Sequence, residues 1–176
     1  RQLVAEGKKR IAVVATPCEV KAVRKIQQTV GGNSEITVIG LFCFEAFNCQ
    51  KLKEQVQARL GVDLDDVVKA EVRAGKFLTQ SKGGEASCKV KDLDCAAERA
   101  CGFCGDFTSR FADISVGSVG SKPGFSTVIV RSERGERLVE GLDAVKAEVD
   151  RQEIVKLAKF KLERSKKSFI NLKQSQ

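Results

Sequence analysis

The pattern of apolar and polar residues predicts alternating strands and helices in the first third of the chain. The apolar run 11–15 has the character of a buried parallel strand, and residues 18–30 follow with helical spacing. Gly31-Gly32-Asn33-Ser34 is expected to end that helix. A second buried strand over 36–42 and an amphipathic helix over 47–60 come next. This order is a βαβ pattern with two adjacent parallel strands.

The rest of the pattern predicts a β-rich insertion, a second set of strands and a helical carboxy-terminal part. In order, we expect a hairpin over 69–81 around Ala74-Gly75, a short strand near 87–90, a loop through 95–104, strands over 113–120 and 125–131, a helix from Glu133 to about Val149, and a basic helical arm from Arg151. The arm is most simply a solvated helix or a segment that lies on a partner. The fold class is therefore mixed α/β (α+β), with a βαβ-type sheet, a β-rich cysteine-containing insertion and a basic helical arm.

Composition excludes several kinds of chemistry. The 176 residues include no histidine, which removes Ser-His-Asp and Cys-His catalysis and histidine-ligated zinc. No apolar run approaches the roughly 20 residues needed to cross a bilayer, and no signal-peptide pattern is seen at the start. We therefore expect a cytoplasmic protein, or one peripheral to a membrane complex. A net charge of +8 suits an anionic partner.

Seven cysteines in such a chain favour metal or redox chemistry over a disulfide framework. Cys101 and Cys104 form a C-x-x-C, and Cys18 and Cys43 each follow a predicted buried strand. The carboxyl ends of parallel strands meet at one edge of a sheet, where ligands bind in open α/β folds. Either strand-end cysteine taken alone is most simply a small buried apolar residue; the pair makes a shared site an equal alternative.

Two groupings of the cysteines follow, and their spacing does not choose between them. In the first, Cys88 and Cys95 join the C-x-x-C in a local zinc site, which would stabilise a basic module for nucleic acid. In the second, Cys18 and Cys43 join it in a dispersed iron–sulfur site. A third interpretation uses only the C-x-x-C, as a redox dithiol.

The segment 115–124 is rich in glycine and serine. Small residues let a backbone approach a flat or phosphorylated ligand closely, and exposed amides bind anions. The simpler interpretation is a glycine-rich turn between two strands. No dinucleotide-binding G-x-G-x-x-G and no P-loop is present.

Six sequence blocks, spread over roughly residues 10 to 145, resemble one family. The chain is similar to the beta subunits of coenzyme F420-reducing hydrogenase, of F420-dependent formate dehydrogenases and of F420H2 dehydrogenase. The blocks are Ala15-Thr16-Pro17-Cys18 with Val23-Arg24-Lys25, Ile39-Gly40-Leu41-Phe42-Cys43 with Glu45 and Phe47, Gly75-Lys76-Phe77, Cys101-Gly102-Phe103-Cys104-Gly105-Asp106-Phe107, residues 112–120, and residues 124–129.

The resemblance implies an electron-transfer oxidoreductase subunit with FAD and a [4Fe–4S] cluster, acting on coenzyme F420. Hydride would pass between F420 and the flavin, and single electrons through the cluster to a partner: catalytic hydrogenase or formate dehydrogenase subunits, or other iron–sulfur subunits of a larger complex. Residues 1–150 would form this domain and 151–176 the arm, with no nucleic acid bound and no membrane crossed.

The resemblance also assigns residues, although none as catalytic. The cluster ligands it implies are Cys18, Cys43, Cys101 and Cys104. The residues it places near the flavin or F420 are Lys76, Ser115, Gly117, Ser118, Val119, Gly120, Ser126 and Thr127. The remaining cysteines, Cys49, Cys88 and Cys95, fall outside the shared blocks.

Three departures from the family pattern affect these expectations. The family has an amino-terminal portion, with a D-G-G block, that helps to hold FAD. The chain begins after this amino-terminal portion. We therefore expect either that the chain is a carboxy-terminal part of a longer protein or that the amino-terminal portion lies on another chain. Phe125 stands where close relatives have tryptophan, and Ala46 stands where they have asparagine.

Overall fold

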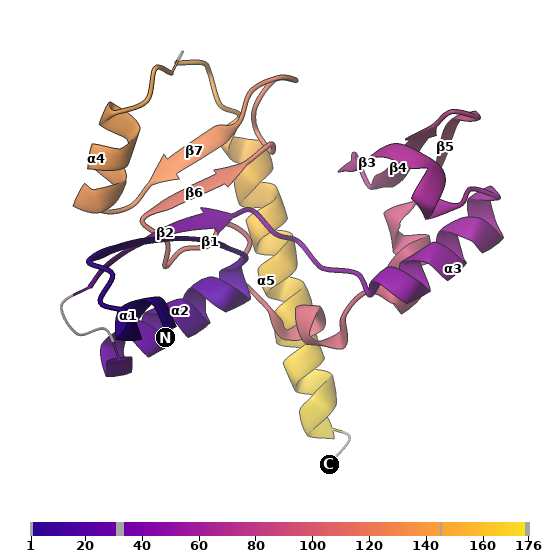
Figure 1. Ribbon diagram of the computed structural model, residues 1–176. Coiled ribbons are helices and arrows are strands. Elements are labelled where there is room, and N and C mark those ends of the chain that lie inside the picture. Colours follow the sequence, from indigo (N-terminus) through magenta and orange to yellow (C-terminus); the bar gives the residue numbers. More distant parts are fainter. Residues whose placement is uncertain (1, 31–33, 145, 175–176) are drawn as a thin grey trace. The chain divides into compact units, whose positions relative to one another are not determined.

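The structure is a computed structural model that describes residues 2–30, 34–144 and 146–174 (Figure 1). The chain divides into two compact units. The first comprises the residues up to Phe44 together with those from Phe103 onward, and the second is Glu45–Gly102. The mixed α/β class and the β-rich insertion predicted from the sequence are confirmed, and the domain boundary at residue 150 stays a prediction.

The first unit contains a four-stranded sheet in the order β1-β2-β6-β7. Its strands are β1 (Arg10–Ala15), β2 (Glu35–Leu41), β6 (Ile114–Gly117) and β7 (Thr127–Val130). The pairs β1–β2 and β2–β6 are parallel, whereas β6–β7 is antiparallel. The predicted βαβ unit is thus present, and its two strands end at the same edge of the sheet.

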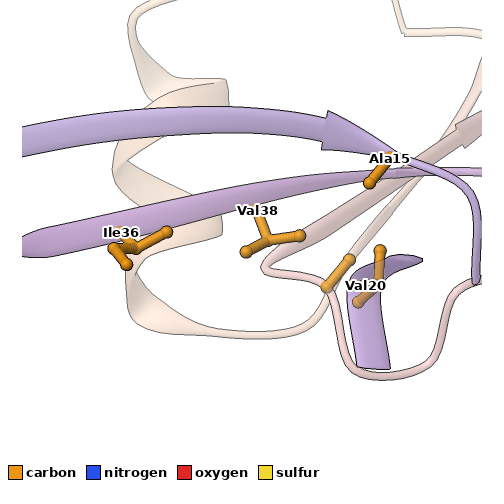
Figure 2. Close-up of a cluster of buried hydrophobic side chains, with 5 residues drawn as sticks. Ala15, Val20, Ile36 and Val38 are labelled. Atoms are coloured by element: carbon orange, nitrogen blue, oxygen red, sulfur yellow. The ribbon is translucent and has the colours of Figure 1, made fainter. Parts of the chain in front are cut away.

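The core of this unit is formed by one face of β2. Burial alternates along the strand, so that Ile36 and Val38 point inward, together with Ala15, Val20 and Ala112 (Figure 2). Gly40 continues the inward set. A side chain there would meet the Ser109 Cβ at 2.3 Å, so only glycine allows the 109–112 segment to pack on the strand.

Four helices belong to the first unit: α1 (Gln2–Ala5), α2 (Pro17–Val30), α4 (Glu133–Glu140) and α5 (Arg151–Gln174). Helix α2 ends where predicted, although Gly31, Gly32 and Asn33 lie outside the described residues. The predicted helix to Val149 is wrong, because α4 stops at Glu140. Gly141 closes α4, and Asp150 then accepts hydrogen bonds from the amides of Gln152 and Glu153 to begin a separate helix.

The second unit packs a helix on a three-stranded antiparallel sheet. Its elements are α3 (Cys49–Leu60), the 3₁₀ helix η1 (Leu64–Asp66), β3 (Val67–Arg73), β4 (Lys76–Ser81), β5 (Gly84–Lys89) and the 3₁₀ helix η2 (Val90–Ala96). Val56, Phe77 and Leu93 form its core. The Asn48 side chain caps α3, and Gly61 ends it in the left-handed conformation.

The turn residues explain the hairpin that the sequence predicts. Ala74 and Gly75 both adopt positive φ, at 49° and 74°, as a two-residue turn between antiparallel strands requires. The predicted loop 95–104, in contrast, is largely 3₁₀ helix, in η2 and in η3 (Arg99–Phe103). Across the described residues, no helix combines the length and the apolarity needed to cross a membrane.

Candidate functional site

Cys18 lies in the first turn of α2, directly after β1. Its sulfur is 3.3 Å from the Thr16 hydroxyl oxygen, and the side chain is exposed. The Glu19 carboxylate accepts hydrogen bonds from the Thr16 amide at 2.8 Å and from its hydroxyl at 2.9 Å. The hydrogen bond from the Thr16 amide, and to a smaller extent the bond from its hydroxyl, lowers the pKa of Glu19. Thr16 therefore contacts both the first turn of the helix and the Cys18 thiol.

Cys43 and the segment after Cys104 are joined directly. The Cys43 amide donates a hydrogen bond to the Phe107 carbonyl at 3.0 Å, and the rings of Phe42 and Phe107 have centroids 5.4 Å apart. The Cys104 thiol donates to the Asp106 carbonyl at 3.7 Å. Both cysteines are half-buried. Because Cys43 follows β2 and Cys18 follows its parallel neighbour β1, both residues lie at the same end of one sheet, and the segment after Cys104 is hydrogen-bonded to Cys43 there.

Helix α5 holds the same two segments by their carbonyl groups. The Lys161 ammonium donates to the Cys43 carbonyl at 2.5 Å, Arg164 to the Phe44 carbonyl at 3.1 Å, and the Ser165 hydroxyl to the Phe103 carbonyl at 2.8 Å. The simple expectation of a solvated arm is wrong for this face of the helix, where Lys161 is only 1% exposed. Sequence reasoning missed these residues, since they are three basic or polar side chains among many in a basic helix.

Cys101 belongs to the second unit, whereas the other three predicted ligands belong to the first. Its sulfur accepts a hydrogen bond from the Ala46 amide at 3.3 Å, and its own amide donates to the Glu98 carbonyl. Among the described residues, no group of three or more cysteine, aspartate, glutamate or histidine side chains is gathered closely enough to hold a metal ion. The structure thus brings the Cys43 and Cys104 segments together, and the four-cysteine set stays a prediction.

Cys88 has the surroundings of a core residue. It is half-buried and packs against the apolar core of the second unit. Burial, assisted by the negative charge of Asp92, raises the pKa of the Cys88 thiol. A zinc ligand must be a thiolate, so this environment disfavours the local zinc site. Cys49 and Cys95 are exposed.

Two of the predicted flavin residues form hydrogen bonds inside the fold. Ser115 is fully buried; its hydroxyl donates to the Ser109 carbonyl at 3.2 Å and accepts from the Arg131 guanidinium at 3.0 Å. Thr127 is 2% exposed and donates to the Val119 carbonyl at 2.8 Å. These hydroxyls shape the β6–β7 turn from within.

The glycines of the same segment also have packing roles. A side chain at Gly117 would lie 2.3 Å from the Phe42 ring, so glycine allows that ring to pack on β6. Gly120 has a φ of 82°, and its amide donates to the Glu153 carboxylate at 3.1 Å. Val119 is half-buried between them.

The remaining candidates are exposed. Ser118 and Ser126 face solvent in the first unit, and Lys76 does so at the start of β4 in the second. Beside Ser118, an open cleft of about 710 Å³ is lined by residues 120–122, 147–151 and Glu153. This surface is accessible to a ligand, in contrast to the buried hydroxyl groups of the turn.

Comparisons with known proteins agree with the resemblance. Residues 8–156 match the family model for the C terminus of the coenzyme F420 hydrogenase/dehydrogenase beta subunit. The chain belongs to this family. It is 36% identical over 181 residues to the beta subunit of the coenzyme F420 hydrogenase of Methanococcus voltae, covering 94% of this chain and 64% of that one.

Two further similarities extend the comparison. One subunit of the F420H2 dehydrogenase of Methanosarcina mazei is 41% identical over 130 residues, which cover 73% of this chain and 37% of that protein. A chain of the F420-reducing [NiFe] hydrogenase complex from Methanosarcina barkeri superposes with a TM-score of 0.81 at 30% identity, covering 94% of this chain and 62% of that chain. The chain thus spans less than two thirds of each of these relatives.

Proposed function

We propose that the chain is an electron-transfer subunit that passes electrons between coenzyme F420 and a partner subunit, by way of FAD and a [4Fe–4S] cluster. The observation that carries the proposal is the joining of the Cys43 and Cys104 segments at the end of the sheet where Cys18 also lies. The family membership supports the F420 link.

The donor set fits an iron–sulfur cluster by its chemistry. The four proposed ligands, Cys18, Cys43, Cys101 and Cys104, are all cysteines, and thiolate sulfur is the donor that such clusters require. A bound cluster would supply one-electron transfer. The protein's own contribution is to orient the sulfurs: Thr16 hydrogen bonds with Cys18, and the Ala46 amide donates to Cys101.

For the flavin, the residues fit two different roles. The exposed Ser118 and Ser126 and the cleft beside Ser118 suit direct contact with a ligand. The buried Ser115 and Thr127 suit support of that surface from beneath. Lys76 is proposed as a positive charge toward an anionic group of the flavin or of F420. FAD would exchange hydride on one side and single electrons on the other, and no catalytic residue is assigned.

The test is anaerobic analysis of iron, acid-labile sulfide, zinc and flavin in the purified full chain. We expect about four irons per chain, as one cubane cluster contains, and a large loss of iron in C43S or C104S. The matched control is the double variant C88S/C95S, which should keep its iron. A colourless protein with stoichiometric zinc that C88S/C95S releases would overturn the proposal in favour of a zinc-stabilised module. Reduction of F420 by the reconstituted complex then tests whether F420 is the substrate.

A further inference from the structure

Lys161 is a buried cation on the face of α5 that contacts the cysteine segments. Its residue exposure is 1%, and its ammonium donates to the Cys43 carbonyl. An ammonium has three N–H donors. Within the described part of the chain, Lys161 forms no ion pair with a carboxylate. Among the described residues, the Cys43 carbonyl dipole is therefore the partner that the fold provides for a full positive charge.

Burying an ammonium in this way is unfavourable unless a negative charge lies nearby. The carbonyl that Lys161 contacts belongs to Cys43, whose thiol is a proposed cluster ligand. The Cys43 amide in turn donates a hydrogen bond to the Phe107 carbonyl, in the segment after Cys104. Four thiolates around an iron–sulfur cluster leave the whole group with a net negative charge. Such a group would offset the cost of the buried cation.

We propose that Lys161 is the buried counter-charge of the cluster and a positioning residue for Cys43, an inference that rests on the cluster proposed above. Lys161 fixes the Cys43 peptide from the carbonyl side, while the Cys43 amide is fixed by Phe107. Arg164 and Ser165 hold the flanking carbonyls of Phe44 and Phe103 in the same way. Helix α5 thus sets both the place and the electrostatic surroundings of the ligands.

The sign of the electrostatic effect follows from the charge balance. Reduction adds one negative charge to the cluster, so a nearby cation stabilises the reduced form more than the oxidised form. Removing the charge of Lys161 should therefore lower the reduction potential.

The experiment compares K161M, K161R and K166M in the full chain, purified anaerobically. Lys166 is an exposed lysine of the same helix, so K166M is the matched control. The readouts are the iron content and the midpoint potential. The potential is measured at one fixed pH, with electron paramagnetic resonance used to monitor the reduced cluster. We expect K161M to disfavour reduction about tenfold, which is about 59 mV for one electron, and K161R and K166M to match the unmodified chain.

The outcomes separate the two proposals. An unmodified chain that binds no iron overturns the proposed cluster itself. A K161M variant with full iron and an unchanged potential overturns only the role of Lys161. Loss of iron in K161M with retention in K161R supports a requirement for the charge. Loss of iron in both K161M and K161R would show that the packing of the lysine side chain matters, and it would overturn the proposed role of Lys161 as a counter-charge.

Discussion

At the scale of single residues, Asp113 shows how one buried carboxylate connects several elements. It accepts hydrogen bonds from the Val38 amide at 2.7 Å, the Ser132 hydroxyl at 2.7 Å and the Arg24 guanidinium at 2.9 Å. Burial alone would raise the pKa of Asp113. The three donors and the charge of Arg24 outweigh burial, so the pKa lies below its ordinary value of 3.8. This carboxylate links α2, β2 and the start of α4 to β6.

The substitution D113N should destabilise the fold. The amide keeps one acceptor but places N–H donors against groups that also donate, so we expect a loss of about 2–3 kcal/mol in the free energy of unfolding. Urea denaturation followed by circular dichroism measures it. The exposed Asp143 offers a control, since D143N should change stability by less than about 0.5 kcal/mol. Equal stability of D113N and the unmodified chain would contradict the role assigned to Asp113.

The pH dependence of stability has a definite sign. Because the native pKa of Asp113 is lowered, its contribution is complete above 3.8, the ordinary value, and is lost as the pH falls through the native value. We expect the unmodified chain to lose stability more steeply than D113N in this acidic range. Parallel acid titration curves for the two proteins would refute this assignment.

At the scale of elements, close backbone packing depends on glycines in the two central strands. Gly40 of β2 faces the Ser109 and Ala112 side chains, and Gly117 of β6 faces the Phe42 ring. Each contact lies beside a segment that carries a proposed ligand or flavin residue. The strands therefore position the site through their closeness as well as through their direction.

The substitution G40A should introduce overlap, because the new Cβ would lie 2.3 Å from the Ser109 Cβ and 2.8 Å from the Ala112 Cβ. We expect a loss of about 1–3 kcal/mol in unfolding free energy, as overpacking usually causes. Gly83 is the control, since its nearest neighbour would be a hydroxyl oxygen at 3.7 Å. Thermal unfolding of G40A and G83A gives the comparison, and equal melting temperatures would argue against tight packing at Gly40.

At the scale of the whole molecule, the four cysteines proposed as cluster ligands are divided between the two compact units. Cys18, Cys43 and Cys104 belong to the first, and Cys101 to the second, three residues before Cys104. The C-x-x-C thus contains the boundary between the units.

The substitution C101S tests whether Cys101 is a ligand of the proposed cluster. If Cys101 is a ligand, C101S should lose iron to the same extent as C43S, although the two residues lie in different units. C95S, which alters an exposed cysteine of the second unit, should keep its iron. Iron analysis and visible absorption measure the result. Full iron in C101S together with loss in C43S would restrict the site to the first unit.

The sequence by itself predicted most of the elements, because apolar periodicity and turn chemistry are local. The strands β1 and β2, the helix α3 with its Gly61 cap, and the Ala74-Gly75 hairpin all follow from neighbouring residues. The family also followed from the sequence, since its blocks are short and contiguous. The end of α4 did not follow from the sequence, because the helical spacing of apolar residues continues past Gly141, the residue that ends the helix.

The tertiary structure decided which side chains are available to the site. The family resemblance places Ser115 and Thr127 near the flavin, and long-range packing buries both side chains in internal hydrogen bonds. Lys161 is one of many lysines in α5, and only the docking of that helix on the Cys43 carbonyl distinguishes it. Periodicity records which residues share a face of a helix, whereas burial of a charge depends on contacts between segments more than a hundred residues apart. The sequence therefore determined the elements, the family and the candidate thiols, and the fold determined which polar groups surround them.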